Sequence, residues 1–215
     1  MWKDLSAAWQ AAFREMWTAF CAGSVPVGAV LCNSEGSIII SDHNRNSEPQ
    51  TINKRIAHAE ANILRRLDTS EFDPRSLTLY TTMEPCPMCM GTALMSNIKR
   101  IRSAARDSYC GMAHLLDNDP YYAAKGVDLR FEGGEPEQVQ LTIQSYHELR
   151  YMEQGAGGNV FEKFAECCPE AANAAKKLYE TKWLDEAAAD GKDFGAVFDH
   201  IITLIVSEQE HIKLC

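Results

Sequence analysis

The chain has 215 residues, is 46% hydrophobic and 24% charged, and therefore suits one folded domain, or one domain with an extension, but not a disordered protein. No apolar run approaches the roughly 18 residues of a membrane span, and no secretory signal is visible at the start, so we expect a soluble, cytoplasmic protein. The formal net charge of −9 argues against a protein that grips long nucleic acid through a basic surface.

Hydrophobic periodicity predicts both helices and strands in the first 153 residues. Residues 4–22 carry large apolar side chains at helical intervals, and the pattern ends near Gly23. VPVGAVLC and SIIIS, joined by the turn NSEG, predict a β-hairpin. The further predicted elements are, in chain order, a helix over 57–67, a strand over 77–82, a helix over 86–96, strands over 99–105 and 127–131, and a helix over 136–153.

Strands that alternate with helices indicate an α/β layered fold with a mixed sheet covered on both faces. QGAGG at 154–158 interrupts this pattern, and the chain beyond it reads as about three helices divided by Pro169 and Gly191. We predict a core domain over 1–153, a linker over 154–158 and a helical extension over 159–215. The large apolar side chains of the extension are expected to pack on each other or on a second subunit.

The stretch EPCPMC places Cys86 and Cys89 three residues apart. A lone C-x-x-C is a weak signal, because it also occurs in thioredoxin-like redox pairs and in structural zinc sites. A structural zinc site would need a second ligand pair, and the adjacent Cys167 and Cys168 cannot supply one. The eight cysteines are irregularly spaced in a chain without a visible signal peptide, so a disulfide framework is not expected.

His58 is the best candidate for a third metal ligand. It opens a predicted helix and is followed at the second position by Glu60, in the pattern H-A-E. Cys86 and Cys89 lie on one side of the first turn of another predicted helix. One imidazole and two thiolates leave the fourth position of a tetrahedral zinc ion open, which is typical of catalytic rather than structural zinc.

Glu60 is two positions from His58 and cannot point the same way on a regular helix, so it suits a general acid/base better than a ligand. H-x-E followed by P-C-x-x-C is the signature of zinc-dependent nucleobase deaminases. We therefore predict a Zn²⁺-dependent aminohydrolase with His58, Cys86 and Cys89 as metal ligands and Glu60 as the catalytic residue.

These motifs resemble those of the cytidine/deoxycytidylate deaminase superfamily, and within it the branch of guanine deaminases and bacterial tRNA adenosine deaminases. The resemblance covers about residues 5–150 and rests on stretches in the same order, namely VPVGAV (25–30), HNR (43–45), LYTTMEPCPMC (79–89), SNIKRI (96–101) and ARD (105–107). It implies a cytidine deaminase-like, three-layer α/β/α fold with a mixed five-stranded central sheet, and assembly as a homodimer.

The resemblance also implies a set of substrate-binding residues around the metal, namely Val27, Gly28, Asn44, Ala59, Glu84 and Pro85. Among them Asn44 would contact the ring or sugar of the substrate, although asparagine in such a loop also commonly caps a turn. Cys110 could line the rim of the site, but we expect it to pack in the core.

We expect the substrate to be a free nucleobase or nucleoside, a purine of the guanine or adenine type. Adenosine in tRNA or other single-stranded nucleic acid is the alternative. The longer loop before His58, the segment SYCGMAHLL after Asp107 and the acidic extension depart from the tRNA enzymes and disfavour it. Two basic clusters could meet phosphates, but side chains of this kind more often form solvated faces; they are Lys54, Arg55, Arg65 and Arg66, and Lys99, Arg100, Arg102 and Arg106. No membrane partner is expected, and a non-enzymatic interaction module is disfavoured because the signature residues are intact.

Overall fold

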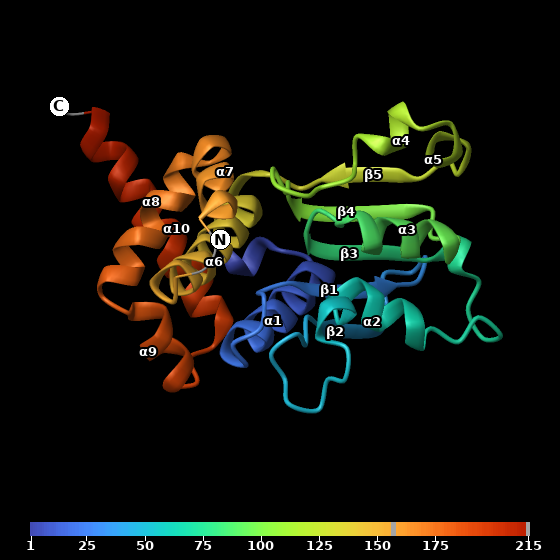
Figure 1. Ribbon diagram of the computed structural model, residues 1–215, viewed down its shortest axis with the longest axis horizontal. Coiled ribbons are helices and arrows are strands. Elements are labelled where there is room, and N and C mark those ends of the chain that lie inside the picture. The colour runs from blue at the N-terminus through green and yellow to red at the C-terminus, as the bar shows by residue number, and fades with distance from the viewer. Residues whose placement is uncertain (156–157, 214–215) are drawn as a thin grey trace.

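The computed structural model describes residues 1–155 and 158–213 and confirms the predicted mixed sheet of five strands, in the order β2-β1-β3-β4-β5 (Figure 1). β1 (Gly28–Cys32) pairs antiparallel with β2 (Ile38–His43) and with β3 (Thr78–Met83). β4 (Arg100–Ala105) and β5 (Asp128–Phe131) continue the sheet in parallel with β3. The three parallel strands therefore end at the same edge, where α/β folds commonly bind ligands.

The predicted hairpin and helices of the core are present with slightly shifted ends. Gly36 adopts a φ of 82° in the turn between β1 and β2, a conformation that glycine accepts without strain. The helices of this part are α1 (Ala7–Cys21), α2 (Ala59–Arg66), α3 (Pro87–Met95), α4 (Leu115–Asn118), α5 (Pro120–Ala124) and α6 (Gly134–Glu153). Three short 3₁₀ turns span Trp2–Asp4, Lys54–Ile56 and Pro74–Ser76.

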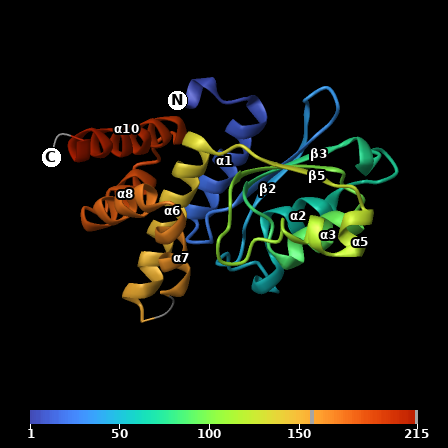
Figure 2. The same ribbon diagram turned by 90° about the horizontal axis from the view of Figure 1, so that it is seen from above.

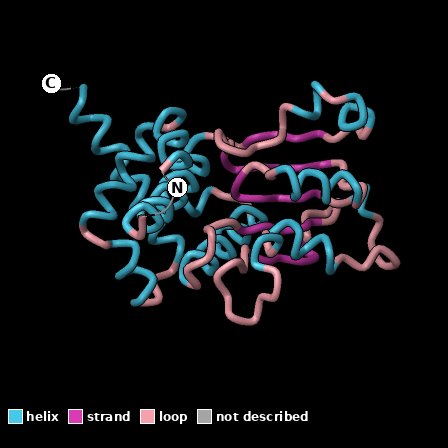
Figure 3. The backbone as a smooth tube through the Cα atoms, in the orientation of Figure 1, coloured by secondary structure: helices cyan, strands magenta, loops and turns pink. Residues whose placement is uncertain are grey.

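Helices cover both faces of the sheet, as Figure 2 shows from above. Alternate residues of β1 pack in opposite directions, because successive side chains of a strand point to opposite faces. Val30 and Cys32 belong to the hydrophobic cluster that contains α1 and α6 residues. Ala29 and Leu31 belong to the cluster that contains α2 and α3 residues. The tube drawing separates the strands from the helices around them (Figure 3).

The region after α6 is helical, as predicted, but its described residues, 158–213, form four helices where about three were expected. They are α7 (Asn159–Cys167), α8 (Pro169–Glu180), α9 (Trp183–Ala189) and α10 (Phe194–Lys213). The break between α8 and α9 is at Lys182, whose φ of 55° is left-handed and is not signalled by a glycine or proline there. Residues 156–157 of the predicted linker and 214–215 of the predicted extension lie outside the described residues.

Helices of the extension pack against α1 and α6. The ring of Phe13 on α1 is buried and lies 5.9 Å from that of Phe194 and 5.7 Å from that of Phe198 on α10. Tyr146 on α6 donates a hydrogen bond of 2.6 Å to Asp185 on α9. The aromatic stripe of α1 is therefore core, as its periodicity predicts, and the extension completes that core. The division into a separable domain and extension stays a prediction.

None of the helices in the described ranges is both long and apolar enough to cross a membrane.

Candidate active site

The fold brings the three predicted metal ligands together at the amino-terminal ends of two helices. His58 immediately precedes α2, Cys86 immediately precedes α3, and Cys89 lies in the first turn of α3. The ligand atoms of the three residues all lie within 4.8 Å of one another. Pro87 occupies the first turn of α3, where a proline costs no backbone hydrogen bond. The helix starts therefore fix the cysteines relative to the histidine.

The spacing of these atoms fits a zinc ion. The sulfur atoms of Cys86 and Cys89 each lie 3.5 Å from Nδ1 of His58. Tetrahedral zinc, with Zn–S of about 2.3 Å and Zn–N of about 2.0–2.1 Å, places a sulfur and a nitrogen ligand about 3.6 Å apart. The donor set of one imidazole and two thiols is also one that zinc prefers. The three side chains are thus arranged to bind zinc and leave one position for a further ligand.

The two thiols differ in acidity. A hydrogen bond from Cys89, together with His58, lowers the pKa of Cys86 to about 4. The contact with Cys86 and burial raise the pKa of Cys89. One thiolate is therefore stabilised by the protein itself, and the second proton must leave when a metal binds.

Glu60 lies beside the ligands and is almost fully buried, with 3% of its surface exposed. Its Oε2 accepts a hydrogen bond of 3.3 Å from Cys89, and its Oε1 accepts one of 3.3 Å from the hydroxyl of Thr81 on β3. Burial raises the pKa of this carboxyl group. A carboxylate next to a metal position, with a pKa moved toward neutrality, is suited to take up and return a proton.

A cavity of about 180 Å³ opens onto these residues. Its walls come from the segment before β1, the loop after β2, the start of α2, the end of β3 and the residues after it, the loop after β4, α6 and α7. The predicted site residues that line it are Val27, Asn44, His58, Glu60, Glu84 and Cys86. Cys110 also lines it, contrary to our expectation of a core position, and its thiol donates a hydrogen bond of 3.1 Å to Asp107. The sequence reasoning missed Gln144, Glu148, Val160 and Phe164, which come from α6 and α7.

The other predicted substrate-binding residues, Gly28, Ala59 and Pro85, are not among the described residues that line this cavity. Gly28 instead allows α1 to pack closely on β1, because a Cβ at this position would lie 2.1 Å from the carbonyl oxygen of Ala12 and 2.4 Å from the amide nitrogen of Met16. Substrate contacts through the backbone of these three residues stay predictions.

Glu84 supports the loop that follows β4. Its two carboxylate oxygens accept hydrogen bonds from the backbone N–H groups of Asp107, at 3.0 Å, and Ala113, at 2.8 Å. The backbone of Gly111 passes so close that a Cβ there would lie 2.3 Å from the Glu84 carboxyl carbon. Glu84 therefore positions one wall of the cavity, including Cys110.

Asn44 lines the cavity and also caps a turn. Its Oδ1 accepts a hydrogen bond of 2.9 Å from the backbone of Asn46, and its own N–H donates to the carbonyl of Val27 at 2.9 Å. Asn62 on α2 donates to the carbonyl oxygens of His43 and Ala57 and so ties the ends of this loop together. The position of Asn44 is thus fixed from both sides.

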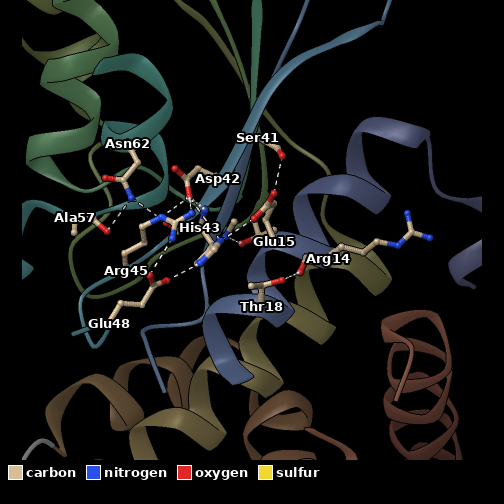
Figure 4. Close-up of polar contacts among 12 residues, drawn as sticks. Arg14, Glu15, Thr18, Ser41, Asp42, His43, Arg45, Glu48, Ala57 and Asn62 are labelled. Carbon is tan, nitrogen blue, oxygen red and sulfur yellow. Dashed lines mark hydrogen bonds and ion pairs between the residues drawn. The ribbon is translucent and has the colours of Figure 1, made fainter. Parts of the chain in front are cut away.

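A network of charged side chains holds the same loop (Figure 4). The His43 ring lies 2.8 Å from Glu15 of α1 through Nδ1 and 2.8 Å from Glu48 of the loop through Nε2. These two partners raise the pKa of His43 against the opposing effect of burial. The other residues of the network are Asp42, Arg45 and Arg66. Arg45 forms ion pairs with Asp42 and Glu48, and Arg66 forms one with Asp42. Glu15, Asp42 and His43 also lie close enough together for a metal, but their ion pairs with one another and with the arginines already satisfy them.

Comparison with known proteins agrees with this site. Residues 3–105 match the model of the cytidine and deoxycytidylate deaminase zinc-binding region. A tRNA-specific adenosine deaminase of Bacillus subtilis (strain 168) is 36% identical over 111 residues, which are 50% of this chain and 65% of that protein. One of Rickettsia bellii (strain RML369-C) is 34% identical over 107 residues, which are 46% of this chain and 69% of the relative.

A solved structure from a study of A-to-I editing by tRNA:A34 deaminases superposes with a TM-score of 0.49 at 25% identity, over 58% of this chain and 95% of that one. The matched family region contains His58, Glu60, Cys86 and Cys89, whose geometry fits catalytic zinc. The chain therefore belongs to the cytidine and deoxycytidylate deaminase family of zinc-dependent deaminases.

Proposed function

We propose that this deaminase acts on an aminated purine that is supplied as a free base or nucleoside. In the reaction the oxygen of a water molecule joins the ring carbon that bears the amine, the carbon–nitrogen bond breaks, and ammonia leaves. When bound by His58, Cys86 and Cys89, zinc would supply Lewis-acid activation of the water. Glu60 would take a proton from the attacking water and deliver it to the leaving nitrogen.

The burial of Glu60 supports this role. A carboxylate with 3% exposure cannot exchange protons freely with bulk water, so the proton it takes up stays available for the leaving amine. Thr81 and Cys89 hold its two oxygens from different elements and limit its rotation. A group held in this way meets the geometric requirement of a general acid/base, which must stay within hydrogen-bond reach of both reacting atoms.

The charge of the cavity is the observation that favours a small substrate. Its lining includes the carboxyl groups of Glu84, Asp107 and Glu148, and the described residues that line it include neither lysine nor arginine. Binding of a polynucleotide draws most of its free energy from contacts between phosphates and cationic side chains. A free base or a nucleoside carries no phosphate and is not repelled by these carboxylates.

The surface next to the cavity is also rich in carboxyl groups. An open cleft of about 1180 Å³ shares Glu84, Asp107 and Tyr109 with the cavity. Its lining carries further carboxylates, namely Asp117, Asp128, Glu137 and Glu170. Arg106 is the arginine among its described residues, and its guanidinium stacks 3.9 Å from the ring centroid of Phe131. A phosphate backbone leaving the cavity in this direction would therefore meet mainly negative charge.

Adenosine in tRNA is the second candidate, and the comparisons support it more strongly than the first. Both relatives described above are named for this substrate. Lys54, Arg55 and Arg65 are exposed and lie close to His58 in the chain, so they are the cationic side chains offered to phosphates in this candidate. The second basic cluster is largely engaged within the protein, since Arg102 pairs with Asp128 and Arg100 donates to Thr78 and to the Ser76 carbonyl.

An ammonia-release assay on the zinc-loaded full chain distinguishes the two candidates. The substrates are adenine, guanine, their nucleosides and nucleotides, and a tRNA anticodon hairpin with adenosine in the loop. The assay is run at about 50 and 200 mM salt. The proposal expects that a base or nucleoside is turned over and that its rate changes little between these two salt concentrations. The second candidate would replace the proposal if the hairpin is the preferred substrate and its turnover falls steeply with salt. Charge reversal at Lys54, Arg55 and Arg65 should then lower the turnover of the hairpin as well.

A further inference from the structure

α7 belongs to the extension, yet it forms part of the wall of the catalytic cavity. Val160 and Phe164 lie one helical turn apart on the same face of α7, and both line the cavity. Both lie well beyond residue 105, where the match to the family model ends. The site of this chain is therefore closed by residues that the family region does not contain.

α7 is fixed in this position by contacts on several sides. Phe164 is 2% exposed and belongs to the hydrophobic cluster that includes Met83 of β3 and Leu141 of α6. The hydroxyl of Ser108, in the loop after β4, donates a hydrogen bond of 3.0 Å to the carbonyl oxygen of Lys163. A helix anchored to the sheet, to α6 and to the loop acts as a fixed wall of the cavity.

The wall that α6 contributes to the cavity is polar, whereas the wall from α7 is apolar. Gln144 on α6 donates a hydrogen bond of 3.0 Å to Glu148, and both side chains line the cavity beside the apolar pair from α7. An aminated ring can place its edge against polar groups and its face against apolar ones. The volume of about 180 Å³ is also below the lower end, roughly 300 Å³, of pockets that hold drug-sized ligands.

We propose that Val160 and Phe164 of α7 determine the size of the substrate, so that the cavity admits a free nucleobase in preference to its nucleoside and excludes a base within a polynucleotide. This proposal rests on the proposed function and narrows it to the smallest member of the substrate class. The extension is then a specificity element of the active site. It selects by filling space, which in hydrophobic pockets discriminates by about 10- to 200-fold per methylene-sized group.

The test compares kcat/KM for adenine and guanine with the values for their nucleosides, in the zinc-loaded full chain. Val160→Ala and Phe164→Leu enlarge the cavity and should raise the nucleoside-to-base ratio by about tenfold. The matched control is Phe161→Leu, because Phe161 is a buried residue of the same helix that packs near Lys176 of α8 and is not among the residues lining the cavity. It should leave the ratio unchanged.

An unchanged ratio in variants that remain folded and active overturns the proposal, as does a hairpin that the unmodified protein deaminates better than the free base. Val160 is only half-buried, so Val160→Ala carries the test if Phe164→Leu does not fold. Calorimetric binding of base and nucleoside to the zinc-loaded Glu60→Gln variant, with and without Val160→Ala, gives the same ratio without turnover. If no compound releases ammonia, the proposed function fails. In that case a nucleoside-to-base binding ratio that Val160→Ala changes still supports α7 as the size filter. An unchanged binding ratio, or binding of neither compound, overturns the role of α7.

Discussion

Substitution of His43 by glutamine removes a cationic side chain that joins three parts of the fold. The imidazole makes two contacts of 2.8 Å, one to Glu15 of α1 and one to Glu48 of the loop that carries Asn44. Hydrogen bonds to charged groups each contribute about 1.5–3 kcal/mol, and glutamine can replace one of the two. We expect the free energy of unfolding to fall by about 1.5–3 kcal/mol near pH 6, a substantial part of the roughly 5–15 kcal/mol of a typical domain.

The loss should depend on pH with a defined sign. The folded-state pKa of His43 is raised above the ordinary value of about 6.5, so its stabilisation is complete below that pH and is lost as the pH rises through the folded-state pKa. The pKa values of Glu15 and Glu48 are lowered, so their contribution is complete above about 4.5 and is lost only in acid. The difference between the protein and His43→Gln should therefore be largest between about pH 5 and 6.5.

Urea unfolding at several pH values, followed by circular dichroism, measures this difference. His114→Gln is the control, because the side chain of His114 is exposed and the variant should match the unmodified protein at every pH. The ion pairs of Asp42 with Arg45 and Arg66 are kept in His43→Gln, so the comparison isolates the imidazole. A difference in unfolding free energy that is independent of pH, or that grows from pH 6 to pH 9, would refute the assignment of His43 as a charged clamp.

Three further substitutions test the site and its framework. Glu60→Gln should keep stoichiometric zinc by metal analysis but lose about 10²- to 10⁴-fold in turnover, and full activity would exclude Glu60 as the proton carrier. Cys89→Ala should lose both zinc and activity, and retained zinc would contradict its role as a ligand. Gly28→Ala should lower the free energy of unfolding by about 1–3 kcal/mol or more because its Cβ would collide with α1. Gly91→Ala, inside α3, should be neutral or stabilising by thermal unfolding, because its Cβ would make an ordinary contact of 3.9 Å with the Tyr122 hydroxyl.

The sheet and the metal ligands could be predicted from the sequence because their signals are local. A continuous apolar run marks β1, β-branched and aromatic residues mark β3, a glycine turn marks the hairpin, and short fixed spacings mark H-x-E and P-C-x-x-C. Each signal lies within about ten residues. Because zinc needs its ligands at short fixed distances, a shared zinc ion then requires His58 and the two cysteines to lie together in the fold. α4 and α5 were missed because helices of four and five residues give no periodicity, although Asp119 before Pro120 is a helix-start signal.

The rest of the cavity wall depends on contacts between segments far apart in the chain. Nothing in the residues near Phe164 indicates that it lines the same cavity as Glu60, about a hundred positions earlier. The partners of His43 come from α1 and from the loop at Glu48, and neither spacing is a recognised motif. Cys110 was assigned to the core because a lone cysteine usually packs there, whereas the loop held by Glu84 turns it toward the cavity.

The metal centre is the feature on which the deaminase chemistry depends. Zinc analysis of the purified full chain, combined with X-ray absorption at the zinc edge, measures the amount of bound metal and the identity of its ligands. We expect one zinc ion per chain, coordinated by one imidazole nitrogen and two sulfur atoms, and loss of ammonia release when the metal is removed. A protein that holds no stoichiometric zinc, or that coordinates it without His58, Cys86 and Cys89, would contradict the site described above.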